Sequence, residues 1–155
     1  MADTPEIVEC AKGLRVVPDH TWDSAPPIDV LVYPGGMGTR DQIGDDRVRT
    51  RIRDIAQRGT LMTSVCTGAL VYADAGLLDG RPATTHWASL EDLARLGHDI
   101  EVRPDDRWVD SGDVITASGV SAGIDMALHL VRRLSSEDRA REVRRYIQYD
   151  PQPPV

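Results

Sequence analysis

The sequence predicts a three-layer α/β sandwich, in which helices cover both faces of a mostly parallel sheet. Short, continuously apolar runs alternate along the chain with segments of helical periodicity, which is typical of buried parallel strands and their crossover helices. Glycine and proline stand where these segments end. Because the chain has 155 residues, of which 41% are hydrophobic, we expect one domain that spans residues 1–155.

The first predicted strand is followed by the first predicted helix. The stretch IDVLVYPGG begins at Ile28 and is apolar or β-favouring until Pro34 stops it, so both faces of this strand are expected to be buried. A helix is expected to begin at Asp45 or Asp46, which are good N-terminal caps, and to end at Gly59. The apolar face of this helix is formed by Val48, Ile52 and Ile55.

The middle of the chain repeats this alternation around one cysteine. The stretch TLMTSV, residues 60–65, predicts a second strand, and a helix through Leu70 is expected directly after Cys66. A short strand at 83–85 follows, and the spacing around Leu93 predicts another helix. The order of these elements places Cys66 at a strand-to-helix turn.

The last third of the chain predicts a hairpin, a core strand and two helices. The pieces IEV, WVD and VITA are short and β-prone, which indicates a hairpin that leads into another core strand. The stretch SAGIDMALHLVRRL predicts a helix that is buried over much of its circumference. A final helix is expected from Ser135 or Ser136, before the proline-rich tail DPQPPV. Its inward face is formed by Ala140, Val143 and Ile147.

Charge and hydropathy exclude two classes of partner. The chain has 18 basic and 25 acidic residues, and its formal charge of -7 offers no general attraction to nucleic acid or to anionic membranes. The N-terminus lacks the pattern of a signal peptide, and no apolar run reaches the roughly 18 residues that a membrane span needs. We therefore expect a soluble protein of the cytoplasm.

The cysteines and histidines form no framework of disulfides or metal ligands. Cys10 and Cys66 lie far apart in unrelated contexts, so we expect both thiols to be reduced. The four histidines are not clustered with either cysteine or with one another, so we expect no metal site. These histidines are His20, His86, His98 and His129.

The stretch SVCTGAL contains the strongest candidate for a functional residue. In an open α/β sheet, ligands bind beyond the carboxyl ends of the strands, and Cys66 would lie there, at a helix N-terminus that stabilises a thiolate. The backbone N–H groups of Gly36 and Thr67 can form an oxyanion hole beside it. From the local pattern alone, an inert buried cysteine is the more common alternative.

Three longer stretches show a family resemblance. The stretches DVLVYPGG, SVCTGALVYADAGLLDGRPATTHW and SGVSAGIDMALHLVRRL occur in the order expected for the ThiJ/PfpI superfamily, which has the class I glutamine amidotransferase-like fold. The tail YIQYDPQPPV resembles the isocyanide hydratase branch of that superfamily. The resemblance covers nearly the whole chain. It implies a flavodoxin-like α/β/α sandwich, a homodimer or higher homo-oligomer, and a nucleophile elbow on which Cys66 is the nucleophile.

The resemblance also implies an activity. Protease-like members have histidine after the cysteine, whereas Thr67 matches the isocyanide hydratase-like members. The implied enzyme is a lyase that hydrates small-molecule isocyanides to N-formamides with Cys66 and Thr67 as catalytic residues, and it requires no cofactor and no metal. Gly35 and His86 are possible substrate-binding residues, although His86 fits a structural role equally well. Three side chains are candidates either for the pocket wall or for the core: Met37, Tyr72 and Trp87.

The resemblance has one gap. Family members normally begin with a strand and helix that supply an acidic partner for the cysteine, and nothing equivalent precedes EIVECAKGLRVVPDHTW. We therefore expect a shortened member that is oligomeric or marginally stable, because the missing strand lies inside the sheet. The general acid/base is unassigned, and Asp74, Glu91 and Asp125 show no motif match. Two alternatives remain: a ligand-sensing or redox-sensing domain, as in the sensor halves of transcriptional regulators, and an inactive truncated protein.

Overall fold

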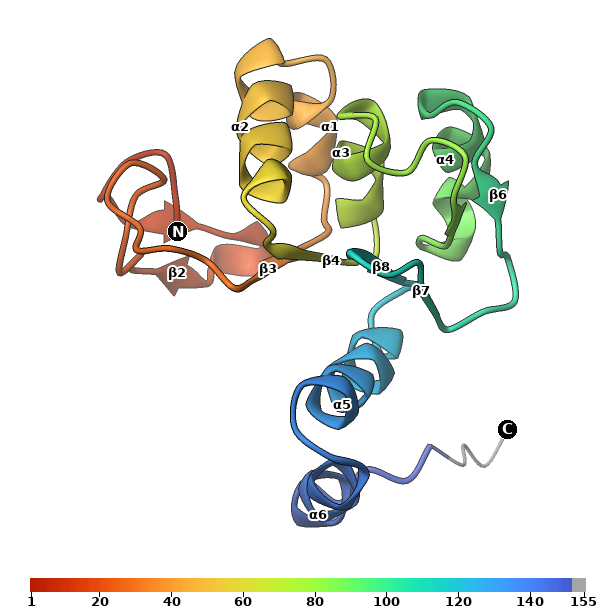
Figure 1. Cartoon of the computed structure of the whole chain (residues 1–155). Helices are drawn as coiled ribbons and strands as arrows, with labels where there is room; N and C mark the ends of the chain where they lie inside the picture. Colours follow the sequence, from red (N-terminus) through yellow and green to blue (C-terminus); the bar gives the residue numbers. More distant parts are fainter. Residues whose placement is uncertain (152–155) are drawn as a thin grey trace.

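A four-stranded sheet forms the centre of the protein in this computed structural model, which describes residues 1–151 (Figure 1). Its strands are β3 (Val30–Tyr33), β4 (Leu61–Val65), β7 (Trp108–Asp110) and β8 (Val114–Ala117). The order across the sheet is β3, β4, β8, β7. Since β3, β4 and β8 are parallel and only β7 is antiparallel, the predicted mostly parallel sheet is confirmed.

Helices lie on both faces of this sheet, as predicted (Figure 1). One face carries α1 (Thr39–Gln42), α2 (Asp46–Gln57), α3 (Gly68–Asp74) and α4 (Leu90–Leu96). The other face carries α5 (Ala122–Leu134), and α6 (Glu137–Tyr146) packs against α5. In the part of the chain that the structure describes, no helix has the length and apolar character needed to cross a membrane.

Two predicted helices, α2 and α6, begin at the capping residues expected from the sequence. The Asp45 carboxylate accepts a hydrogen bond from the N–H of Arg47 at 2.8 Å, at the start of α2. The Ser136 hydroxyl accepts one from the N–H of Arg139 at 3.1 Å, at the start of α6. Gly59 follows α2 with a φ of 86°, a conformation that glycine adopts without strain. These boundaries are therefore set by local chemistry.

Two small sheets lie outside the central one, and they differ from the predicted strands. A hairpin pairs β1 (Val8–Glu9) with β2 (Arg15–Val16), where the sequence predicted no element. The strand expected at 83–85 is β5 (Pro82–Ala83), and it pairs in parallel with β6 (Glu101–Val102). The predicted IEV strand therefore belongs to a parallel pair, and the antiparallel hairpin is formed by β7 with the core strand β8 itself. Short 3-10 turns span Ala11–Gly13 and Trp87–Ser89.

The main core lies between the sheet and the helices α2, α3 and α4. Tyr33 of β3 and Tyr72 of α3 pack edge to face, with their ring centroids 5.6 Å apart. The Tyr72 hydroxyl donates a hydrogen bond to the carbonyl oxygen of Thr63 at 2.9 Å, which ties α3 to β4. A smaller core under α5 contains Leu61, Ile115, Ala117 and Met126.

Three burial predictions were wrong, and all concern the side of the sheet that carries α5 and α6. Leu31 and Tyr33 are buried, but Val32, on the opposite face of β3, is 51% exposed. The α5 helix is not buried over much of its circumference, because only Ala122 and Met126 are fully buried along it. The physical reason is that α5 is the only helix that packs directly on this face within residues 1–151. The predicted inward position Ile147 is likewise half exposed.

The strand β3 ends the central sheet and leaves one edge unpaired among residues 1–151. The N–H of Leu61 donates to the carbonyl oxygen of Asp29 at 2.8 Å, so the backbone of Asp29 faces β4. Because the N–H and C=O groups of successive residues point to opposite sides of a strand, every second residue from Asp29 faces β4. The N–H and C=O groups of Val30 and Val32 therefore point away from β4. Unpaired edges of this kind favour association with another strand.

We expect two copies of the chain to associate through β3. Antiparallel pairing of Val30 with Val32 of a second copy would satisfy the outward peptide groups of both strands and cover both valine side chains. Sedimentation velocity should show a dimer for the wild-type chain and a monomer for Val32→Lys, because a charge on an edge strand opposes pairing. Val17→Lys, at a valine 69% exposed outside the sheet, should remain dimeric. A wild-type monomer at all concentrations would contradict this expectation.

Candidate functional site

Cys66 lies between β4 and α3 in a left-handed conformation. Its φ is 57°, which residues with a side chain rarely adopt. The Cys66 N–H donates to the carbonyl oxygens of Ala117 and Ser118, at 3.0 and 3.1 Å, just past the end of β8. This sharp turn places the partly buried Cys66 at the carboxyl end of the sheet, as the sequence predicted.

Two glycines allow the backbone to approach the elbow closely. A Cβ on Gly35 would lie 2.8 Å from Cys66 Cβ and 2.8 Å from Thr67 N, closer than real side chains come. A Cβ on Gly68 would lie 2.4 Å from the carbonyl oxygen of Tyr33. Larger residues at these positions would separate the β3 loop from the elbow. Gly35 therefore has a packing role at the site, and its predicted contact with substrate stays a prediction.

Thr67 and Gly36, the two residues expected to form the oxyanion hole, lie against each other. The N–H of Gly36 donates to Thr67 Oγ1 at 2.9 Å, and this hydroxyl lies 3.2 Å from the carbonyl oxygen of Gly36. The Gly36 N–H is thus already engaged by the threonine side chain. The N–H of Thr67 makes no hydrogen bond within residues 1–151. Of the two expected donors, Thr67 is the one that is free, and the oxyanion hole stays a prediction.

His86 lies near the backbone of the elbow. Its Nδ1 accepts a hydrogen bond from the N–H of Ala88 at 3.2 Å, and this bond caps the short turn that follows. A Cβ on Gly119 would lie 2.7 Å from His86 Cδ2, so the ring packs on the segment that accepts the Cys66 N–H. Both contacts are structural. They do not test the substrate-binding role expected for His86.

Thr85 is a site residue that the sequence interpretation missed. It is 1% exposed, and its hydroxyl donates to the carbonyl oxygen of Cys66 at 2.8 Å. The only signal in the sequence was its place beside His86 in the TTHW motif. Of the three side chains considered for a pocket wall, Tyr72 is fully buried, whereas Met37 and Trp87 are each 77% exposed.

The three carboxylates considered for proton transfer are either paired with arginine or exposed. Asp74 accepts hydrogen bonds from Arg49 at 2.7 Å and from the Gly44 N–H at 2.9 Å. Asp125 pairs with Arg107 at 2.6 Å, and Glu91 is exposed at the start of α4. Burial alone would raise the pKa of Asp74, but the hydrogen bonds from Arg49 and Gly44 hold it below its usual value. Asp74 therefore anchors the elbow helix α3 to α2.

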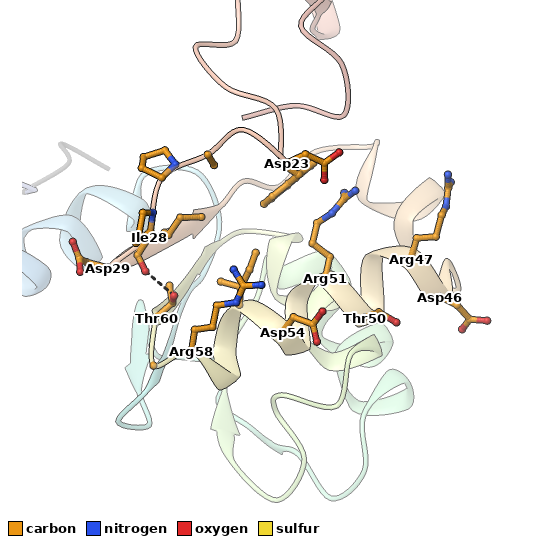
Figure 2. A pocket seen from close by; sticks show the side chains of 16 residues that line it. Asp23, Ile28, Asp29, Asp46, Arg47, Thr50, Arg51, Asp54, Arg58 and Thr60 are labelled. Carbon is orange, nitrogen blue, oxygen red and sulfur yellow. Dashed lines mark hydrogen bonds between the residues drawn. The ribbon is translucent and has the colours of Figure 1, made fainter.

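A pocket of about 910 Å³ lies elsewhere, between the segment around Trp22 and α2 (Figure 2). Arg51 stacks on Trp22 with its guanidinium carbon 4.9 Å from the ring centroid, and it pairs with Asp3 at 2.9 Å. The Thr60 hydroxyl donates to the carbonyl oxygen of Ile28 at 2.6 Å, and both residues belong to the lining of the pocket. Cys66 is not part of the lining. The candidate catalytic cysteine and this pocket are therefore separate features.

Asp74→Asn should lower the free energy of unfolding by about 1.5–3 kcal/mol at neutral pH, the usual range for hydrogen bonds to a charged group. The folded-state pKa of Asp74 is lowered, so its stabilising effect is complete above the unfolded value of about 3.9 and is lost as the pH falls through the folded value. Urea denaturation at a series of pH values should therefore show the variant and wild type converging in acid.

The exposed Asp54 of α2 provides the matched control for this prediction. Asp54→Asn should change the free energy of unfolding by no more than about 0.5 kcal/mol at any pH. A difference between Asp74→Asn and wild type that stays constant into acid would show that the ionised carboxylate is not what anchors α3.

Comparisons with known proteins relate the chain to enzymes and regulators. The sequence model described as DJ-1/PfpI family matches residues 2–133. The isonitrile hydratase of Pseudomonas putida is 42% identical over 147 residues, which cover 95% of this chain and 63% of that protein. The HTH-type transcriptional regulator GbdR of Pseudomonas aeruginosa is 34% identical over 130 residues, which cover 81% of this chain and 34% of the regulator.

A solved structure agrees with these sequence matches. The crystal structure of a ThiJ/PfpI family protein from Pseudomonas syringae superposes with a TM-score of 0.89 at 35% identity, covering 99% of this chain and 63% of that one. This chain therefore spans less than two thirds of the length of each of these relatives. The family match over residues 2–133, with the left-handed cysteine elbow and the shared fold, shows that the chain belongs to the DJ-1/PfpI (ThiJ/PfpI) family.

Proposed function

We propose that the chain is a cysteine-dependent isocyanide hydratase, which adds water to a small isocyanide and releases an N-formamide. One observation carries the proposal: Cys66 occupies a left-handed strand-to-helix turn in a chain that is 42% identical to an isonitrile (isocyanide) hydratase. Because the chain spans 63% of that relative, the activity is proposed for the residues present in this chain.

The reaction can proceed through covalent catalysis at Cys66. The Sγ atom bonds to the terminal carbon of the isocyanide, which also takes up a proton, and a thioimidate results. Water then adds to this carbon, and the nitrogen accepts a proton. The added hydroxyl group then loses its proton to water, and expulsion of the thiolate breaks the C–S bond and releases the N-formamide. In sum, one isocyanide and one water give one formamide, and the cysteine is regenerated.

The surrounding residues have separate proposed roles. The free N–H of Thr67 would stabilise negative charge on the oxygen of the tetrahedral intermediate. The apolar substituent of the substrate would contact Met37 and Trp87, which are each 77% exposed. In the sequence, Met37 follows Gly36 and Trp87 follows His86. Asp74 and Asp125 are held by arginines, so water is the proton donor that we propose.

Replacing the cysteine tests this proposal. Cys66→Ala should abolish formamide production from an aryl isocyanide, measured by chromatography of the product. The loss should be at least about a hundredfold, because the covalent route is removed. Cys10→Ser is the matched control, since Cys10 is exposed and lies outside the elbow, and it should retain full activity. Formamide production that persists in Cys66→Ala would contradict the mechanism, and a wild-type chain without turnover would contradict the activity.

A sensing function is the second candidate, favoured by the 34% identity to GbdR over 81% of this chain. In that case Cys66 would respond to a ligand or oxidant without turnover. Dilute peroxide should then convert Cys66 reversibly to one equivalent of sulfenic acid, detected by mass spectrometry after trapping with dimedone. Isocyanide turnover that depends on Cys66 would exclude this function as the main one.

A further inference from the structure

The carbonyl oxygen of Cys66 accepts a hydrogen bond from the Thr85 side chain and a longer one, at 3.4 Å, from the Ala69 N–H. Thr85 Oγ1 donates to it at 2.8 Å from a side chain that is 1% exposed. The neighbouring Thr84 is also buried, but its Oγ1 has no partner within the described residues. Burial of threonine in this segment therefore does not by itself produce such a contact. The Thr85 bond is specific to the peptide that follows the cysteine.

That peptide also carries the free donor of the site. The C=O of Cys66 and the N–H of Thr67 belong to one planar trans peptide, in which the two groups point in opposite directions. Because Thr85 holds the carbonyl on one side, the N–H is directed to the other side. Gly35 packs close to this nitrogen, since a Cβ on it would be 2.8 Å from Thr67 N. A hydrogen bond to the carbonyl also polarises the same peptide and strengthens its N–H as a donor.

We propose that Thr85 is a positioning residue, which orients and polarises the Cys66–Thr67 peptide so that the Thr67 N–H serves as the oxyanion donor. This inference deepens the proposed function and rests on it. The left-handed Cys66, with a φ of 57°, makes such support necessary, because a residue with a side chain does not favour this conformation. Gly36 cannot replace the donor, since its own N–H is bound to Thr67 Oγ1.

Two thiol reagents distinguish positioning of the oxyanion donor from a general effect on the cysteine. With p-nitrophenyl acetate, Cys66 Sγ attacks the ester carbonyl, negative charge develops on oxygen, and p-nitrophenolate leaves as a thioester forms. With iodoacetamide, Sγ displaces iodide from a saturated carbon, and no oxyanion forms. Both reactions are measured in a Cys10→Ser background, so that only Cys66 reports. Neither reagent is an isocyanide, so the result is independent of hydratase turnover.

Three substitutions test the role of Thr85. In Thr85→Val, the rate of acylation by p-nitrophenyl acetate should fall about tenfold or more, which approaches the fall in rate when an oxyanion donor is removed. The rate of alkylation by iodoacetamide should change less than about twofold. Thr85→Ser, which retains the hydroxyl, should restore acylation. Thr84→Val, which removes the unpartnered hydroxyl next to it, should leave both rates unchanged.

Several outcomes would overturn the inference. These are equal losses in both reactions of Thr85→Val, unchanged acylation in that variant, or a loss of the same size in Thr84→Val. Acylation of the wild-type site no faster than in Cys66→Ala would also overturn it, because the Thr67 N–H would then support no oxyanion. Circular dichroism at the assay temperature identifies any variant that has unfolded. If Thr85→Val unfolds, the acylation rates of Thr85→Ser and Thr85→Ala are compared instead. A rate in Thr85→Ser that is no higher than in Thr85→Ala would then overturn the inference.

Discussion

The left-handed backbone at Cys66 is the constraint on which the rest of the site depends. Its φ of 57° turns the chain sharply from β4 into α3 and brings the thiol to the end of the sheet. The strain is tolerated because both peptide groups of this residue are held. The N–H is shared by the carbonyls of Ala117 and Ser118, and the C=O is held by Thr85. Two segments distant in sequence thus determine the orientation of one side chain.

The same constraint explains why small and hydroxylated residues surround the cysteine. The loop after β3 must pass within contact of the elbow, and only glycine at 35 and 68 leaves room for it. Buried hydroxyls then supply the hydrogen bonds that water provides at an open surface. The Thr67 hydroxyl binds the β3 loop, and the Thr85 hydroxyl binds the elbow itself. Among residues 1–151, the Thr67 N–H is left without a hydrogen-bond partner.

The two faces of the sheet differ in how completely they are covered. Four helices lie over one face, and Asp74 and Arg49 join two of them through an ion pair at 2.7 Å. On the other face, α5 is the one helix of residues 1–151 that packs on the sheet, and α6 packs on α5. Val32 is exposed for this reason, at the open edge of β3. The site is therefore built against the well-packed face, while the exposed edge offers a surface for association.

The sequence by itself determined the features that depend on residues close together in the chain. Apolar runs and periodicity identified the core strands, Asp45 and Ser136 located two helix starts, and the position of Cys66 between a strand and a helix predicted the elbow. Only the tertiary structure decided the contacts that join distant segments, because periodicity reports which face of an element is apolar but not what covers it. The exposure of Val32 and the bond from Thr85 to the Cys66 carbonyl, 19 residues away, are of this kind.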